Sequence, residues 1–295
     1  MTHSSPTQVA ELLKKQIQDF INLSPENTLN TNRPEKAFST PLVGFSRGDD
    51  SIFEDYKEHV GPFHLTPLEV FSDSFPTVSV TARDLTVISW ILPHTEVTKK
   101  DNRKETSYPS ERWARARIFG EEVNNKLRKH VLVQLQKAGY EAVAPVFSPL
   151  WKTSISSRFG RASTWSERHA AYASGLGTFG LCDGLITAAG KAMRTGSVVA
   201  RIQAQPTARP YEHHRQYCLY FTSGTCGKCI KRCPVDAISK EGHDKEKCFA
   251  YLKPVTADYV KTHFKFDGYG CGLCQTKVPC ESKIPEPGDL KAYEE

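Results

Sequence analysis

The sequence of 295 residues lacks any long apolar run. No stretch approaches the roughly 18 consecutive apolar residues of a membrane-spanning helix, so none is predicted. The start, from Met1 to Pro6, is polar and has neither a secretory signal pattern nor twin arginines. Without an export signal, we expect the nine cysteines to stay free of disulfides in a reducing cytoplasm.

The sequence also lacks a strong excess of either charge. Lysine and arginine number 39 and aspartate and glutamate 33, which gives a formal net charge of +6. A balance of this size does not by itself indicate a nucleic-acid partner. The apolar share of 39% and the charged share of 24% are typical of a globular protein. The length suits one large domain or two.

Cysteine, in contrast, is concentrated in one stretch. Eight of the nine cysteines fall in two groups: Cys218, Cys226, Cys229, Cys233 and Cys248, Cys271, Cys274, Cys280. The first group contains C-G-K-C-I-K-R-C-P, which matches the last three cysteines of the bacterial ferredoxin motif C-x2-C-x2-C-x3-C-P. Ser223 occupies the place of the first ligand. We expect Cys218, five residues upstream, to replace it.

Eight thiolates suit two [4Fe–4S] clusters, and in two-cluster ferredoxins the fourth cysteine of each motif ligates the other cluster. On this pattern, one cluster has the ligands Cys218, Cys226, Cys229 and Cys280. The other has the ligands Cys233, Cys248, Cys271 and Cys274. A zinc ribbon is the alternative for paired C-x2-C steps, but one ribbon would leave four cysteines and the C-x3-C-P step unexplained.

The residues before the cysteines predict a layered domain. The β-branched run Thr86 to Leu92 indicates a buried strand, and a long helix is predicted from about Ser110 to Ala138, ended by Gly139. A strand from Tyr140 to Ala144 follows. The order of strand, helix and strand favours an α/β or α+β arrangement.

We expect three parts. Residues 1–80 form an N-terminal helix and an irregular segment that wraps the protein, and residues 81–212 form the α/β domain. Residues 213–295 form the ferredoxin-like domain. Polar loop is expected from Lys99 to Pro109, and a short helix after the cysteine motif from Pro234 to Ser239.

Glycine gathers just before the cysteine-rich stretch. The segment Gly175-Leu-Gly-Thr-Phe-Gly180 formally matches G-x-G-x-x-G. It is not expected to bind a dinucleotide, because a helix is predicted before it and a strand after it, whereas that motif requires strand and then helix. The glycines instead indicate that the backbone turns tightly or comes close to a large flat ligand.

These residues resemble a known family. The block S-E-R-H-A-A-Y-A-S-G-L-G-T-F-G, then D-G-L-I-T, G-S-V and C-G-K-C-I-K-R-C-P-V-D-A-I, is similar to the cobalamin-dependent iron–sulfur reductases. These comprise the epoxyqueuosine reductases and, more distantly, the reductive dehalogenases. The resemblance implies an α+β fold, with a nitroreductase-like corrin-binding α/β domain followed by a two-cluster ferredoxin-like domain. It also implies that electrons pass through two [4Fe–4S] clusters to the cobalt of cobalamin and then to a substrate.

The resemblance assigns corrin contacts to two segments. Their residues are Gly175, Gly177, Thr178, Phe179, Gly180, Gly184, Thr195, Gly196 and Ser197. The proposed proton donor of epoxyqueuosine reductases is the Asp of G-R-D-Y-H. The corresponding helix here reads R-A-R-I-F-G-E-E-V-N and has no Asp there. Glu121 and Asp183 are the candidate donors in its place, a solvated carboxylate being the alternative for Glu121. The ninth cysteine, Cys182, is expected to lie near the corrin or to act as a small buried hydrophobe.

Two functions remain open from the sequence. The first is a corrinoid-dependent reductase supplied by an electron donor of the ferredoxin or flavodoxin type. The second is a ferredoxin-type electron-transfer protein that serves a partner and could reduce another protein's corrinoid. A tRNA substrate is not supported, because the helical-repeat extension of many tRNA-acting members is absent. The sequence does not identify the substrate.

Overall fold

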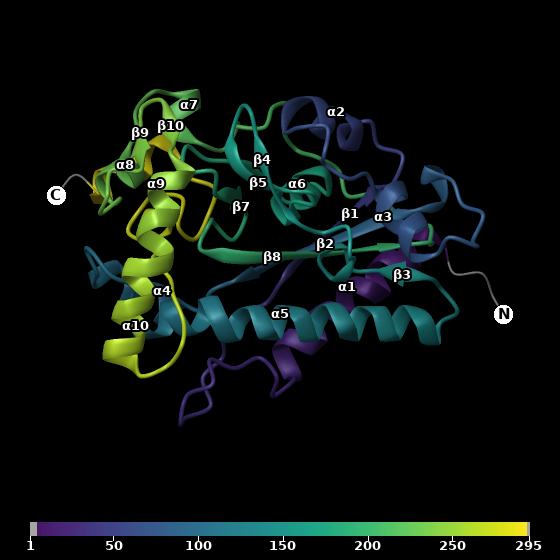
Figure 1. Cartoon of the computed structure of the whole chain (residues 1–295), viewed down its shortest axis with the longest axis horizontal. Helices are drawn as coiled ribbons and strands as arrows, with labels where there is room; N and C mark the ends of the chain where they lie inside the picture. The colour runs from purple at the N-terminus through teal and green to yellow at the C-terminus, as the bar shows by residue number, and fades with distance from the viewer. Residues whose placement is uncertain (1–4, 294–295) are drawn as a thin grey trace.

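A four-stranded antiparallel sheet forms the centre of the computed structural model, which describes residues 5–293 (Figure 1). Its strand order is β1 (Leu42–Arg47), β2 (Thr86–Pro93), β8 (Met193–Ala200) and β3 (Ala142–Val143). β2 pairs along its whole length with β8 and is buried throughout, as its β-branched sequence predicted. β1 comes from the first 80 residues, so the N-terminal part contributes a strand to the central sheet.

One face of the sheet is covered by α5 (Glu111–Lys137) and α1 (Pro6–Leu23) (Figure 1). The hydroxyl of Ser110 caps α5 by accepting from the amide of Trp113, and Gly139 follows its end with a φ of +84°. The long helix predicted from the sequence is therefore confirmed. Apolar side chains of both helices pack with the sheet in the first hydrophobic core, which includes Ile17, Leu127 and Trp90.

The opposite face carries three short helices: α2 (Ile52–His59), α3 (Pro67–Ser74) and α6 (Glu167–Ala173). Phe53, Phe71 and Trp165 pack there with the sheet in a second core. The sequence predicted α6, but the expectation of an irregular segment before residue 75 was wrong. Helices of eight residues span about two turns, too few to show a periodic pattern.

Several small elements extend from this framework. β4 (Thr153–Ser156) and β5 (Gly160–Ser163) form a hairpin, and β6 (Gly177–Phe179) pairs with β7 (Leu185–Thr187). α4 (Glu96–Lys104) replaces most of the polar loop expected from residue 99, a correction to the sequence analysis. The side chain of Thr95 caps this polar helix, which gave no apolar stripe for the sequence to reveal.

The C-terminal part is built from short elements around the cysteines. They are α7 (Leu219–Thr222), α8 (Lys228–Lys231), β9 (Ile238–Ser239), β10 (Gly242–His243), α9 (Lys245–Ala250), η3 (Tyr251–Val255), α10 (Thr256–Phe264), η4 (Leu273–Gln275) and η5 (Pro287–Tyr293). The helix expected from Pro234 to Ser239 was wrong, because this stretch turns and then forms β9. No helix between residues 5 and 293 is long and apolar enough to cross a membrane.

α4 connects the two parts. Nδ2 of Asn102 donates to the carbonyl oxygen of Cys271 at 3.2 Å, and Nε of Arg103 donates to the Glu281 carboxylate at 2.9 Å. From the other side, Nη1 of Arg232 donates to the carbonyl oxygen of Glu105 at 2.7 Å. The cysteine-bearing segments are thereby fixed against the α/β part.

His64 is buried in the second core. Its side chain is 1% exposed, and its ring centroid lies 5.3 Å from that of Tyr56 and 6.4 Å from that of Trp165. Within residues 5–293, neither of its ring nitrogens has a hydrogen-bond partner. Burial lowers the pKa of His64 to about 4.

We expect this histidine to make the fold sensitive to acid. The pKa of His64 is lower in the folded protein than in the unfolded chain, so protonation of this histidine favours unfolding. The contribution of neutral His64 to the free energy of unfolding is therefore complete above about pH 6.5 and is lost as the pH falls toward 4. Between about pH 7 and about pH 5.5 the loss amounts to about 1 kcal/mol, or about 2–4 °C in Tm. In anaerobic thermal unfolding, the drop in Tm between these two pH values should be smaller by that amount in the His64→Phe variant than in the unmodified protein. A variant of exposed His263, His263→Phe, should behave like the unmodified protein, and equal losses in all three would contradict the assignment.

Candidate functional site

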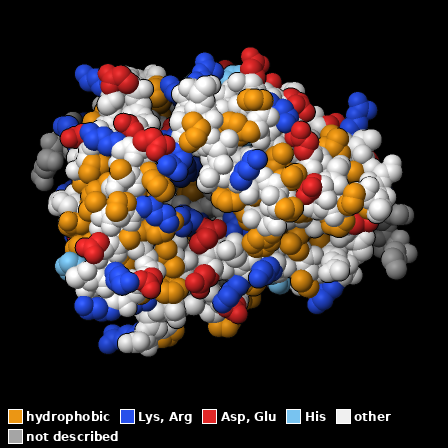
Figure 2. All heavy atoms as spheres, viewed as in Figure 1, with side chains coloured by type: hydrophobic (Ala, Val, Ile, Leu, Met, Phe, Trp, Pro, Cys, Tyr) orange, Lys and Arg blue, Asp and Glu red, His pale blue; other side chains and the backbone are white. Residues whose placement is uncertain are grey.

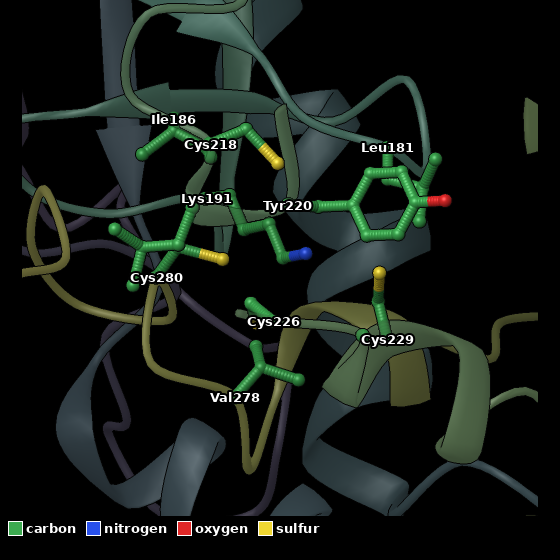
Figure 3. A pocket seen from close by; sticks show the side chains of 11 residues that line it. Leu181, Ile186, Lys191, Cys218, Tyr220, Cys226, Cys229, Val278 and Cys280 are labelled. Atoms are coloured by element: carbon green, nitrogen blue, oxygen red, sulfur yellow. The ribbon is translucent and has the colours of Figure 1, made fainter. Parts of the chain in front are cut away.

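Four cysteines line one cavity in the C-terminal part (Figure 3). Its sulfur-bearing residues are Cys218, Cys226, Cys229 and Cys280. They are the four assigned above to one cluster. No three metal-ligating side chains among residues 5–293 lie close enough to share a single metal ion. The four thiols instead surround an open volume, and this donor set fits an iron–sulfur cluster.

Local structure explains how residues distant in sequence meet there. Cys218 is the N-cap of α7, and Cys229 lies within α8. Cys280 arrives from the far end of the domain, where its carbonyl oxygen accepts a hydrogen bond from the amide of Lys191 at 2.9 Å. Leu181 and Ile186 of the α/β part complete the wall, so both parts of the chain enclose this cavity.

The second group gathers around Cys271. Burial, together with the neighbouring Cys248 and Cys233 thiols, raises the pKa of Cys271 to about 12. The amide of Ala237 donates to Sγ of Cys233 at 3.2 Å, the kind of hydrogen bond that influences a cluster's potential. Cys274, on η4, lies close to the thiol of Cys182. The second set of four cysteines therefore lies in the same domain, beside the first.

Three of the glycines assigned to corrin contact lie against other parts of the protein. A Cβ on Gly177 would lie 2.2 Å from the carbonyl oxygen of Ile186, and one on Gly175 2.6 Å from that of Ala208. A Cβ on Gly196 would lie 2.5 Å from Nε1 of Trp90. At Gly180 and Gly184 the nearest atoms, at 3.3 and 3.4 Å, also belong to the protein. At Gly175, Gly177 and Gly196 the absence of a side chain therefore permits close packing of the protein chain.

Two of the hydroxyls assigned to corrin contact are also engaged. Oγ1 of the fully buried Thr178 accepts from the amide of Tyr217 at 2.9 Å. Oγ of Ser197 donates to Glu167 at 2.5 Å and accepts from Nε1 of Trp165 at 3.0 Å. Phe179 and Thr195 are only half-buried. Figure 2 shows a hollow, bordered by charged side chains, near where Figure 1 draws the start of β8.

Glu121 is held as an anion. It extends from α5 and accepts from Nε of Arg194 at 3.1 Å and from Nη1 of Arg128 at 2.9 Å. Burial opposes ionisation, but the two arginine charges outweigh it and lower the pKa of Glu121 to about 2. This environment stabilises the carboxylate, the form that cannot donate a proton.

Glu167 is a buried carboxyl that the sequence analysis did not select. It accepts from Nη2 of Arg128 at 3.0 Å and from Oγ of Ser197 at 2.5 Å. Burial raises the pKa of Glu167 despite the arginine. No signal in the sequence separates it from an exposed glutamate at the start of a helix, because its partners come from α5 and β8.

Asp183, the other candidate proton donor, lies on the cluster side. It adopts a φ of +57° and pairs with Nδ1 of His243 at 3.2 Å and with Nζ of Lys245 at 3.6 Å. Burial acts against protonation of His243, but hydrogen bonds to Asp183 and Cys248 raise its pKa to about 9. Asp183 and Glu121 therefore hold different partners in different parts of the structure.

Comparison with known proteins supports the cluster assignment. Residues 222–281 match a family described as "4Fe-4S double cluster binding domain". The matched range contains seven of the eight cysteines, and Cys218 lies just before it. Over 72 residues the chain is 38% identical to an epoxyqueuosine reductase of Leadbetterella byssophila. This match covers 23% of this chain and 22% of the relative. The match thus spans about a fifth of that protein.

Solved structures match over nearly the whole chain. An epoxyqueuosine reductase gives a TM-score of 0.52 at 16% identity, covering 96% of this chain and 70% of that one. A reductive dehalogenase linked to B12-dependent dehalogenation gives 0.52 at 14% identity, covering 99% and 34%. At such identities the likeness establishes the fold. The predicted α+β class and the predicted resemblance are confirmed: the chain has the fold of these reductases, and residues 222–281 match a 4Fe-4S double cluster binding domain.

Proposed function

We propose that this chain is a corrinoid-dependent iron–sulfur reductase, similar to the epoxyqueuosine reductases, that passes electrons through two [4Fe–4S] clusters to cobalt and on to a substrate. The observation that carries the proposal is the four-cysteine cavity, whose wall includes Leu181, Ile186 and Lys191 of the α/β part. A redox centre at this place lies against the part of the chain that would hold a second cofactor. The solved reductases that share this fold support the same interpretation.

A bound cobalamin supplies a cobalt centre that exchanges electrons with the clusters and with the substrate. The chain's own residues enclose the cavity sulfurs and orient the charged side chain of Arg194. Leu181, Ile186 and Val278 shield the cavity sulfurs from water. Glu121 fixes the guanidinium of Arg194 on β8. Of the two carboxylates proposed as proton donors, Glu121 is kept ionised by its arginine partners, and Asp183 pairs with Nδ1 of His243 and Nζ of Lys245.

The partners in this proposal follow from the clusters. A cluster takes up one electron at a time, so we propose an external donor of the ferredoxin or flavodoxin type in a reducing cytoplasm. One epoxyqueuosine reductase structure contains a modified tRNA stem loop, and this chain covers 66% of that protein. A tRNA substrate is not part of the proposal, and the substrate stays unassigned.

The test is an anaerobic titration of the purified, iron-loaded protein with cob(II)alamin, followed by visible absorbance. We expect saturable binding at tens of micromolar or tighter, which corresponds to about −6 kcal/mol or more favourable. Absence of binding while the iron–sulfur absorbance is intact would leave the electron-transfer protein as the function. Gly177→Val is unsuitable as a binding variant, because its side chain would collide with the backbone of Ile186.

A further inference from the structure

Lys191 and Cys182 form a buried pair beside the cluster cavity. Lys191 is 3% exposed and Cys182 6%, and Nζ of Lys191 donates to Sγ of Cys182 at 3.3 Å. Figure 3 shows the Lys191 side chain reaching into the cavity among the cysteines. Both residues lie outside the range 222–281 that matches the cluster-binding family. The α/β part therefore supplies a cation to a cavity of thiols.

The backbone fixes Lys191 at this place. A tight turn from Thr187 to Gly190 precedes it, in which the amide of Gly190 donates to the Thr187 carbonyl oxygen at 2.8 Å. Gly190 has a φ of +78°, and a Cβ there would lie 2.1 Å from the carbonyl oxygen of Glu281. The amide of Lys191 then donates to the carbonyl oxygen of Cys280. The lysine is thus attached directly to a segment that bears a cluster ligand.

Cysteine side chains share the cavity with the Lys191 ammonium. Lys191 lines the cavity together with Cys229 and Cys280, and its Nζ contacts Sγ of Cys182. Within residues 5–293, Lys191 forms no ion pair with a carboxylate, and its side-chain partner is a sulfur. A buried charge without a partner destabilises the folded protein. An anionic iron–sulfur centre held by these cysteines would provide that counter-charge.

We infer that Lys191 is a counter-charge shared by the two clusters and raises their reduction potentials. Cys229 and Cys280 of one predicted ligand set line the cavity with Lys191. Cys274 of the other set lies close to Cys182, the side-chain partner of Lys191, so one ammonium acts on both sets. Each reduction adds one electron from the external donor to a cluster and leaves Lys191 chemically unchanged. The added negative charge is stabilised by the ammonium, and Cys182 holds Nζ in position. The inference rests on the proposed clusters and not on the corrin or the substrate.

The test compares Lys191→Met with Lys191→Arg in the full chain after anaerobic reconstitution, by iron content and by reductive titration followed with electron paramagnetic resonance. We expect Lys191→Met to lower the midpoint potential of at least one cluster so that its reduction is about tenfold less favourable, or ~59 mV for one electron. Lys191→Arg, which keeps the charge, should stay within a few-fold of the unmodified protein. The control is Lys231→Met, because Lys231 is exposed and lies two residues after Cys229.

Each outcome decides a different point. Full iron content in Lys191→Met with unchanged potentials would overturn the inference while leaving cluster binding intact. Loss of iron in Lys191→Met alone, with Lys191→Arg fully loaded, would support it, because arginine shares the positive charge of lysine and methionine lacks it. Loss of iron in both variants would show that packing matters rather than charge, and would overturn it. An unmodified protein without iron and sulfide would instead reject the proposed function itself.

Discussion

The Cys218→Ala variant is expected to hold about four irons per chain after anaerobic reconstitution, half of the about eight expected for the unmodified protein. Cys218 is buried and faces the cavity that also contains Cys226, Cys229 and Cys280. Its loss leaves three thiolates for a cluster that needs four ligands. Because cluster binding is coupled to folding, the variant should also lose stability and become easier to proteolyse around α7.

Ser223→Ala is the matched control. Ser223 occupies the first ligand position of the ferredoxin motif, but it is exposed and its hydroxyl donates to the carbonyl oxygen of Leu219 at 2.8 Å. We expect this variant to keep about eight irons and eight acid-labile sulfides. The reverse result, with iron lost only from Ser223→Ala, would show that the serine oxygen is the ligand. One zinc per chain without sulfide would reject the clusters altogether.

Local signals made part of the fold predictable. The strand β2, the long helix α5 and the short helix α6 each have a continuous apolar pattern or a clear end signal within their own sequence. α4 lacked an apolar stripe, and α2 and α3 were too short to show one. For α3 a signal did exist, since Thr66, Pro67 and Glu69 form a capping box with proline at the first turn.

Residues of the candidate site were predictable only where the spacing of cysteines in the sequence identifies metal ligands. The C-x2-C and C-x3-C-P steps identified cluster cysteines because adjacent ligands must lie on one turn. The glycines were identified as places of close approach, but the sequence could not show that the approaching atoms belong to Ile186 and Ala208. Cys182 is buried as expected, yet its neighbours are Cys229 and Cys274. These contacts depend on tertiary structure, which local sequence does not encode.

Arg128→Met is expected to destabilise the α/β part by about 3–5 kcal/mol, because it leaves a buried anion without its cation. Arg128 lies on α5 with 1% of its surface exposed. Its guanidinium donates to Glu121 at 2.9 Å, to Glu167 at 3.0 Å and to the carbonyl oxygen of Thr195 at 3.3 Å. Glu121 keeps Arg194 as a partner, whereas Glu167 keeps only the hydroxyl of Ser197.

The loss of stability in the Arg128→Met variant is expected to depend on pH. Burial already raises the pKa of Glu167, and removal of the Arg128 charge raises it further. Protonation removes the unpaired charge, so the loss of stability should be largest at neutral and alkaline pH and should shrink as the pH falls. Anaerobic thermal unfolding at several pH values, with a drop in Tm of about 10 °C near pH 7, would display this trend.

Two further variants separate charge from packing. Arg128→Met combined with Glu167→Gln should recover part of the loss, because the amide removes the buried charge while keeping its shape. Lys126→Met, on the same helix, breaks an exposed ion pair with Glu26 and should cost no more than about 1 kcal/mol. A single Arg128→Met variant as stable as Lys126→Met would contradict the prediction. In that case the Glu167 carboxyl would already be neutral in the native protein, and its hydrogen bond with Ser197 would be sufficient to satisfy it.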